Sequence, residues 1–159
     1  MAVALVSILV LVVLVFLVGL SLPKQRTHTQ GASLKSPPEK VFLVVTNFRD
    51  QTSWRSDLKS VEVIDDKTWI EIPKKGTPIT FREKQKKENR LFEIEIVAPK
   101  SFNGHWVGTF EETQTGTKVI FKEAVVINNP FLRVLSHVFI DLDKTMKTYL
   151  KDLKTKLGE

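Results

Sequence analysis

Two glutamates are the side chains in this sequence with the strongest case for acid–base chemistry. Glu71 lies in an alternating stretch on the same side as Trp69, and Glu123 is flanked at two-residue spacing by Phe121 and Val125. Because alternate residues of a strand share a face, both carboxyls are expected to point inward among apolar neighbours. Burial raises the pKa of a carboxyl and makes it a candidate general acid or base. The simpler alternative is a carboxylate that pairs with a lysine or arginine, or that orients a ligand at a cavity mouth.

Cysteine and histidine offer little further chemistry. The chain has no cysteine, which excludes disulfides, thiol catalysis and cysteine metal sites. The three histidines, His28, His105 and His137, have neither the i, i+4 spacing nor the H-x-H spacing of a metal site. We therefore expect no metal and no cofactor.

An alternating apolar pattern predicts the strands that would position the two carboxyls. Between Leu58 and Ile127, short alternating stretches are separated by turns, and the pattern is clearest at Phe92, Ile94 and Ile96. Strands that recur about every 8–12 residues with short turns are typical of an antiparallel meander. With a weaker strand at 27–35, the sheet should contain about seven strands.

Two short helices are expected after the first strand. The stretch Ser36-Pro37-Pro38-Glu39 has the form of a capping box, in which the Ser36 hydroxyl would accept from the N–H of Glu39. Residues 47–57 hold aromatic side chains in a polar setting, which predicts a second short helix or turn.

The segment 129–159 predicts one long amphipathic helix. Asn129 is a favourable N-cap, Pro130 suits the first helical position, and Gly158 marks the C-terminal end. Between them, apolar residues recur at three- and four-residue spacing along one face. Strands followed by a helix predict an α+β fold in which the sheet wraps around this helix.

The N-terminal segment is apolar enough to cross a membrane. Residues 2–20 carry no charge and span about 28 Å as a helix, close to the thickness of the hydrocarbon core. A cleaved signal peptide is the alternative, but no basic residue precedes the segment and the site after it is poor for cleavage. The sequence favours a transmembrane anchor at 2–21, a tether at 22–26 and a ligand-binding domain at 27–159.

Charge indicates where that domain lies. The first basic residues, Lys24 and Arg26, follow the apolar segment, which places the domain on the cytoplasmic side of a single-pass membrane protein. The formal net charge of +6 would attract the domain to anionic headgroups. Lysines alternate with acids, and no basic patch is studded with aromatic residues, so no nucleic acid partner is expected.

Three stretches resemble the START-related, or SRPBCC, helix-grip superfamily, which includes polyketide cyclases and lipid-transfer domains. Residues 36–42, followed by Trp54, resemble the family's entry into its first helix. The sequence Gly104-His105-Trp106, with 116–119, resembles its penultimate hairpin, and 128–133 leading to Tyr149 resembles its final helix. The resemblance spans about residues 26–157, and the N-terminal apolar segment makes the chain similar to membrane-anchored bacterial members.

The resemblance implies a cavity between the sheet and the C-terminal helix that takes an apolar ligand. Large apolar side chains on the inward faces are then candidate ligand contacts. These are Trp69, Phe92, Trp106, Phe121, Leu135 and Phe139.

Three functions follow as hypotheses. The first is binding or transport of a lipid or other hydrophobic small molecule by a membrane-anchored domain, without catalysis. The second is a cyclase- or hydrolase-like enzyme that acts on a polyketide or lipid-like substrate through Glu71 or Glu123. The third is a protein-interaction module. A fold of this kind hosts many activities, so the site must decide between them.

Overall fold

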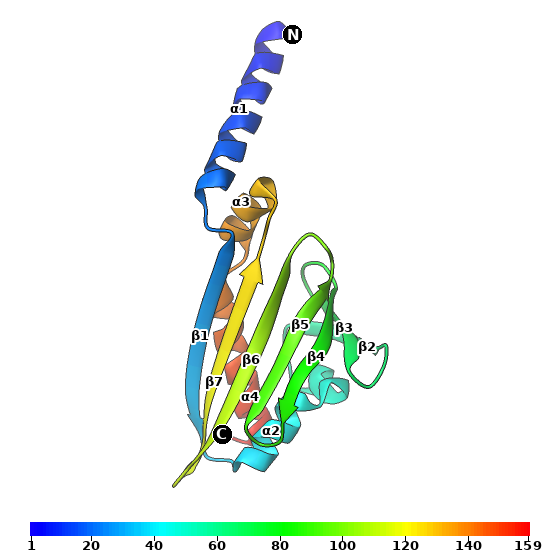
Figure 1. Ribbon diagram of the computed structural model, residues 1–159, viewed down its shortest axis with the longest axis vertical. Helices are drawn as coiled ribbons and strands as arrows, with labels where there is room; N and C mark the ends of the chain where they lie inside the picture. The colour runs from blue at the N-terminus through cyan, green and yellow to red at the C-terminus, as the bar shows by residue number, and fades with distance from the viewer.

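Seven antiparallel strands form one sheet that lies over the helix at the C-terminal end of the chain (Figure 1). The computed structural model describes all 159 residues. The predicted α+β helix-grip fold is confirmed. The elements are α1 (Ala2–Ser21), β1 (Gln25–Leu34), α2 (Pro38–Thr46), the 3₁₀ helix η1 (Phe48–Ser53), β2 (Leu58–Val63), β3 (Thr68–Pro73), β4 (Ile79–Lys87), β5 (Leu91–Ala98), β6 (Asn103–Thr113), β7 (Gly116–Val126), α3 (Pro130–Phe139) and α4 (Leu142–Leu157).

The first and last strands in the sequence are neighbours in the sheet. In the order β1-β7-β6-β5-β4-β3-β2, strands β2 to β7 pair with their sequence neighbours and β1 pairs with β7. This pairing places Glu123 of β7 between His28 of β1 and Trp106 of β6. Because side chains alternate along a strand, Glu123 shares its face with Phe121 and Val119.

The core lies between the inward face of the sheet and the helices α2 and α4. Val119 and Phe121 of β7 are almost completely buried, as is Leu153 of α4. Val41 and Val45 of α2 complete the same cluster. Alternation in the strands and three- and four-residue spacing in the helices direct apolar side chains to this one layer.

The predicted single helix at 129–159 is instead two helices. The Asn129 side chain caps α3 by accepting from the N–H groups of Phe131 and Leu132, and Gly158 ends α4 in the left-handed conformation, as expected. Between them, Ile140 and Asp141 are extended, and the Asp141 carboxylate caps α4 by accepting from the N–H of Lys144. The apolar pattern continues through the break, so periodicity alone did not reveal it.

The predicted capping box at Ser36 is wrong. Helix α2 begins at Pro38 with Pro37 as its N-cap, and no side chain caps it. The backbone of Ser36 has other partners, because its N–H donates to Glu159 and its carbonyl accepts from the hydroxyl of Thr117. The second short helix is present as η1.

Helix α1 projects away from the sheet and meets the rest of the protein only near its C-terminal end (Figure 1). It is the one helix long and apolar enough to cross a membrane. Gly19 is its single buried residue and lies against the start of α3. A Cβ atom at Gly19 would overlap the backbone carbonyl of Pro130, so glycine permits the close approach of the two helices.

Candidate functional site

A cavity of about 100 Å³ lies between the sheet and the first turns of α4. A buried water needs only about 10–15 Å³ by a comparable measure, so the cavity has room for several water molecules or a small apolar group. Its apolar lining comes from four strands and two helices, namely Val45, Phe81, Phe92, Ile94, Trp106, Phe121, Met146 and Tyr149. Its polar lining consists of Gln51, Arg55, Glu71, Glu123 and Thr145.

Aromatic rings make up much of the cavity wall. The ring centroid of Trp106 lies 4.9 Å from that of Phe121 and 6.2 Å from that of Tyr149. Phe121 and Tyr149 meet edge to face at 5.6 Å, and Phe92 meets Trp106 at 6.4 Å. Rings in such arrangements are held in place by their neighbours, which gives the wall a defined shape.

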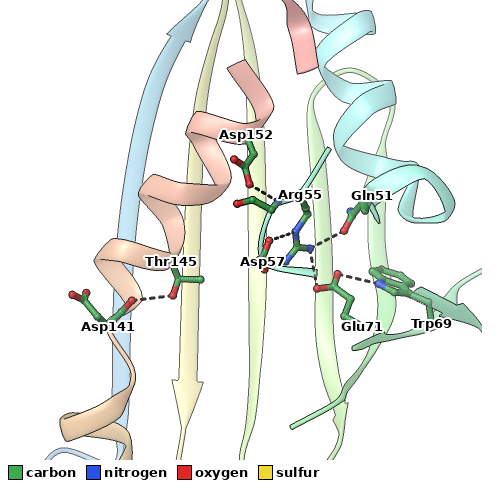
Figure 2. Close-up of polar contacts among 9 residues, drawn as sticks. Gln51, Arg55, Asp57, Trp69, Glu71, Asp141, Thr145 and Asp152 are labelled. Atoms are coloured by element: carbon green, nitrogen blue, oxygen red, sulfur yellow. Dashed lines mark hydrogen bonds and ion pairs between the residues drawn. The ribbon is translucent and has the colours of Figure 1, made fainter. Parts of the chain in front are cut away.

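The guanidinium of Arg55 is the centre of a polar network at one side of the cavity (Figure 2). Its Nε and Nη2 atoms donate to the two carboxylate oxygens of Asp57 at 3.1 and 2.7 Å. Its Nη1 donates to Gln51 Oε1 at 2.7 Å and to Glu71 Oε2 at 2.8 Å. The Arg55 side chain is 11% exposed, and its guanidinium also lies 5.3 Å from the centre of the Tyr149 ring.

Glu71 is held on both of its carboxylate oxygens. One accepts from Arg55, and the other accepts from the indole Nε1 of Trp69 at 3.2 Å (Figure 2). Trp69 is itself fixed by stacking on Phe48, with ring centroids 4.4 Å apart. Glu71 is therefore a paired, buried carboxylate, which matches the simpler of the two expectations for it.

Glu123 and Tyr149 present polar groups to the cavity without partners in the protein. Burial raises the pKa of the Glu123 carboxyl; the charge of Arg55 opposes this rise, and that of Glu71 adds to it. Burial also raises the pKa of the Tyr149 hydroxyl. Neither group makes a side-chain hydrogen bond within the protein, so both can form a hydrogen bond with a ligand in the cavity.

The network around Arg55 has one more carboxylate than it has cations. Burial opposes the charge of Arg55, but Glu71 and Asp57 raise its pKa above the ordinary value and keep it ionised. A single guanidinium thus faces two carboxylates, which leaves one negative charge in excess at this side of the cavity. The carboxylate of Asp57 is 35% exposed, so part of this excess charge is solvated.

The structure brings together five of the eight candidate residues. Glu71, Glu123, Phe92, Trp106 and Phe121 all line the cavity. Trp69 lies behind the wall, completely buried against Phe48 and Phe81. Leu135 and Phe139 lie on the exposed surface of α3, outside the cavity.

Sequence reasoning missed Arg55, Gln51 and Tyr149. Arg55 and Gln51 fall in the polar stretch 47–57, where no periodicity indicates which side chains point inward. Tyr149 lies on the apolar face of the C-terminal helix, where periodicity alone predicts an ordinary core position. Its hydroxyl was a usable signal, since it is the only tyrosine of the chain and a buried hydroxyl needs a polar neighbour.

The histidines lie elsewhere. His28 contacts Asp143 on α4 at 3.2 Å, and His137 Nδ1 lies 2.9 Å from the carbonyl of Arg133. None of the three lines the cavity. No group of three or more histidine, aspartate or glutamate side chains is arranged to hold a metal ion.

Solved structures with the same fold are numerous. A protein from Mesorhizobium loti matches with 13% identity and a TM-score of 0.65, over 84% of this chain and 97% of its own. A START superfamily protein from Mycobacterium smegmatis matches with 9% identity and a TM-score of 0.62, over the same shares of the two chains. The di-domain ARO/CYC BexL matches with 12% identity and a TM-score of 0.66, over 87% of this chain and 52% of its own.

Identities this low establish the fold and nothing finer. A comparison with curated proteins found no match. The model of one protein family, described as polyketide cyclase/dehydrase and lipid transport, matches residues 26–158. That match spans the sheet, the cavity and both C-terminal helices, and the chain therefore belongs to the polyketide cyclase/dehydrase and lipid transport family.

Proposed function

We propose that this protein is a membrane-anchored domain that binds a lipid or other hydrophobic small molecule in its cavity, without catalysing a reaction. The observation that carries the proposal is the composition of the cavity wall. The wall is mainly aromatic and aliphatic, and it presents two unpartnered polar groups, those of Glu123 and Tyr149. Apolar walls with a few orienting polar groups are the usual form of a small-molecule site.

The hydrogen bonds that Arg55 already makes within the protein support an uncharged ligand. Four of the five N–H groups of Arg55 already donate to Asp57, Gln51 and Glu71, so a ligand carboxylate could not form a bidentate pair with it. A free fatty acid would therefore place its carboxylate beside Glu71 without a cation of its own to pair with. An ester, ketone or hydroxyl group would instead accept a hydrogen bond from a protonated Glu123 or from Tyr149.

The size of the cavity bears on how the ligand enters. Pockets for drug-sized ligands measure roughly 300–1,000 Å³, well above the cavity volume here. A longer ligand therefore requires side chains to move. Met146 lines the cavity beside the exposed residue Thr145, and its flexible thioether chain can change rotamer at low cost.

The proposal is tested by filling the cavity. Met146→Trp adds a large ring to the cavity wall, whereas Lys147→Trp adds the same ring on the exposed side of α4, where Lys147 pairs with Asp143. Both variants keep α1, so lipid held by the anchor is the same in each. The measurement is mass spectrometry of the lipids that remain with the purified full chain, with titration of the fluorescent probe 1-N-phenylnaphthylamine alongside.

We expect wild type and Lys147→Trp to retain one apolar ligand per chain and Met146→Trp to lose it. Among retained lipids, neutral species should exceed free fatty acids. If the two tryptophan variants and wild type retain the same lipids and bind the probe equally, the cavity is not the binding site and the proposal is wrong.

A cyclase- or hydrolase-like reaction on a polyketide or lipid-like substrate is the second candidate. Glu123 favours it, because an unpaired carboxyl with a raised pKa can act as a general acid. Glu123→Gln separates the two functions. A binding protein keeps ligand uptake in this variant and shows no turnover in wild type, whereas an enzyme turns over candidate substrates in wild type and loses that activity in the variant.

We also propose that α1 spans the membrane once and that the domain lies in the cytoplasm. The apolar composition of Ala2–Ser21 and the basic residues that follow it support this arrangement. A C-terminal reporter should be protected from protease in intact cells and digested after lysis. Digestion in intact cells would place the domain on the outside, and loss of residues 1–21 from the mature protein would identify a signal peptide.

A further inference from the structure

Helix α3 buries two polar side chains and leaves several of its apolar side chains exposed. Its two buried residues are Arg133, which is 3% exposed, and Ser136. Its apolar residues face the surroundings: Val138 is 68% exposed and Phe139 is 77% exposed. A helix on a water-soluble surface has the reverse arrangement, because burial of apolar area is what stabilises its packing.

The polar face of α3 is used to hold the end of α1. Arg133 Nη1 donates to the carbonyls of Gly19 at 2.8 Å and Leu22 at 3.1 Å. Its Nη2 donates to the carbonyl of Asn128 at 2.9 Å. The last carbonyls of a helix lack partners within the helix and lie at the negative end of its dipole, so a buried arginine there is a favourable cap.

A second arginine fixes the other end of α3. Arg26 of β1 donates through Nη1 to the carbonyl of Ser136 at 2.9 Å and through Nη2 to that of Ile140 at 3.0 Å. Arg133 therefore caps α1, and Arg26 caps α3. The two contacts hold α3 between the base of α1 and the first strand of the sheet, which is where it lies in Figure 1.

The exposed apolar surface of α3 continues from that of α1. Phe16 of α1 and Phe131 of α3 are in contact, with ring centroids 5.6 Å apart, and both remain partly exposed. Leu135 and Val138 follow Phe131 at helical spacing on the same face. The apolar surface thus runs from the last turns of α1 onto α3 without an intervening charged side chain.

We propose that α3 is an interfacial helix whose exposed residues Leu135, Val138 and Phe139, with Ile140 directly after the helix, insert into the lipid leaflet in which α1 ends. The inference rests on the proposed membrane anchorage of α1 and goes beyond it. Twenty helical residues rise about 30 Å, which matches the hydrocarbon core and brings the last turn of α1 to the membrane–water boundary. Helix α3 is packed at that last turn, so its apolar face meets the acyl chains and headgroups at the same depth.

The absence of cysteine allows a direct test on the full chain. Single variants Val138→Cys, Leu11→Cys and Lys154→Cys are each labelled with a fluorophore and reconstituted in phosphatidylcholine/phosphatidylglycerol vesicles. Leu11 lies in the middle of α1, and Lys154 is exposed on the far part of α4. Emission is compared with and without doxyl-labelled phosphatidylcholine, and with and without aqueous iodide.

We expect the labels at residues 11 and 138 to lose emission to the doxyl lipid, and the label at residue 154 to lose emission only to iodide. If the label at 138 responds only to iodide while that at 11 responds to the lipid, α1 is an anchor but α3 does not insert, and this inference alone is wrong. A label at 138 shielded from both quenchers would assign the surface to a second copy of the chain and overturn the inference. If the label at 11 does not respond to the lipid, both the anchorage and the role of α3 are wrong.

Discussion

Arg55 follows η1 and lines the cavity. Its guanidinium donates hydrogen bonds to the side chains of Gln51, Asp57 and Glu71. Without its guanidinium, Glu71 would be a nearly buried carboxylate whose only remaining donor is the indole of Trp69. Removing one member of a buried ion pair costs far more than the pair contributes, because the other charge is left desolvated.

The first prediction therefore concerns Arg55→Met. We expect it to lower the free energy of unfolding by about 3–5 kcal/mol. Arg82→Met is the matched control, because Arg82 also contacts a carboxylate, that of Glu95, but is 55% exposed. An exposed pair contributes about 1 kcal/mol or less. Urea denaturation of the full chain in detergent measures both, and equal losses in the two variants would contradict the role given to Arg55.

The second prediction concerns Glu123 and pH. Burial raises the pKa of this carboxyl, so the native state keeps its proton at pH values where the unfolded chain, with its ordinary pKa of 4.5, has lost it. Stability is therefore greatest below that value and falls as pH rises through the native pKa, with a slope of at most about 1.4 kcal/mol per pH unit.

Glu123→Gln should remove this fall in stability with rising pH, because glutamine does not ionise. It should therefore raise the free energy of unfolding at neutral pH relative to wild type. Urea denaturation across pH 4–9 measures it. Glu111→Gln, an exposed position on the adjacent strand β6, should keep the slope of wild type. A steep pH dependence that survives in Glu123→Gln would assign the titration to another group.

Single residues also show how far the sequence alone could specify the site. Alternation in the strands was sufficient to place Glu71, Phe92, Trp106, Phe121 and Glu123 on the inward face. Arg55 could not be found in this way, because its position depends on the turn after η1 and on contacts with Glu71 and Tyr149, which are distant in sequence. Leu135 and Phe139 do lie on the apolar face that the helical spacing predicts. The spacing does not say whether such a face meets a cavity, a core or a membrane.

At the scale of elements, the break at Ile140 and Asp141 gives the last two helices different surroundings. Helix α4 buries Met146, Leu150 and Leu153 against the sheet, whereas α3 turns its apolar face outward. The alternating apolar pattern was enough to predict the strands, and the capping residues Asn129 and Gly158 were enough to predict the outer ends of the two helices. The break was not predictable in this way, although Asp141 is a capping residue of the same kind as Asn129.

The third prediction tests that cap. Asp141→Ala should cost about 1 kcal/mol in the free energy of unfolding, because the N–H of Lys144 loses its acceptor. Asp141→Asn should keep most of the stability, since its amide oxygen can accept the same bond. Lys144→Ala, an exposed neighbour, should change it by at most about 0.5 kcal/mol. If Asp141→Ala equals Lys144→Ala, the two helices are separated by packing and not by the cap.

At the scale of the whole molecule, the helix that carries the exposed apolar surface leads directly into the helix that lines the cavity. Thr145, Met146 and Tyr149 belong to the first turns of α4, directly after α3, and α3 is packed on the base of α1. If α1 spans the membrane and the cavity binds a ligand, as proposed above, that ligand would have a short path along α3 to the first turns of α4. This arrangement requires α1 to keep a fixed orientation relative to the domain, and few contacts are available to fix it.

The fourth prediction tests that orientation through Gly19. A side chain at this position meets the backbone of Pro130, which cannot yield as a flexible side chain can, so Gly19→Leu must move α1 away from α3 and break the contacts of Arg133 with Gly19 and Leu22. Spin labels placed by cysteine substitution at Val12 on α1 and Thr29 on β1 should then show a broader distance distribution by pulsed electron spin resonance. Ala4→Leu adds the same side chain at an exposed position of α1 far from α3, and it should leave the distribution as narrow as in wild type. A narrow, unshifted distribution in Gly19→Leu would mean that Arg133 and the Phe16–Phe131 contact do not set the angle between anchor and domain, and the short path from membrane to cavity would lose its structural basis.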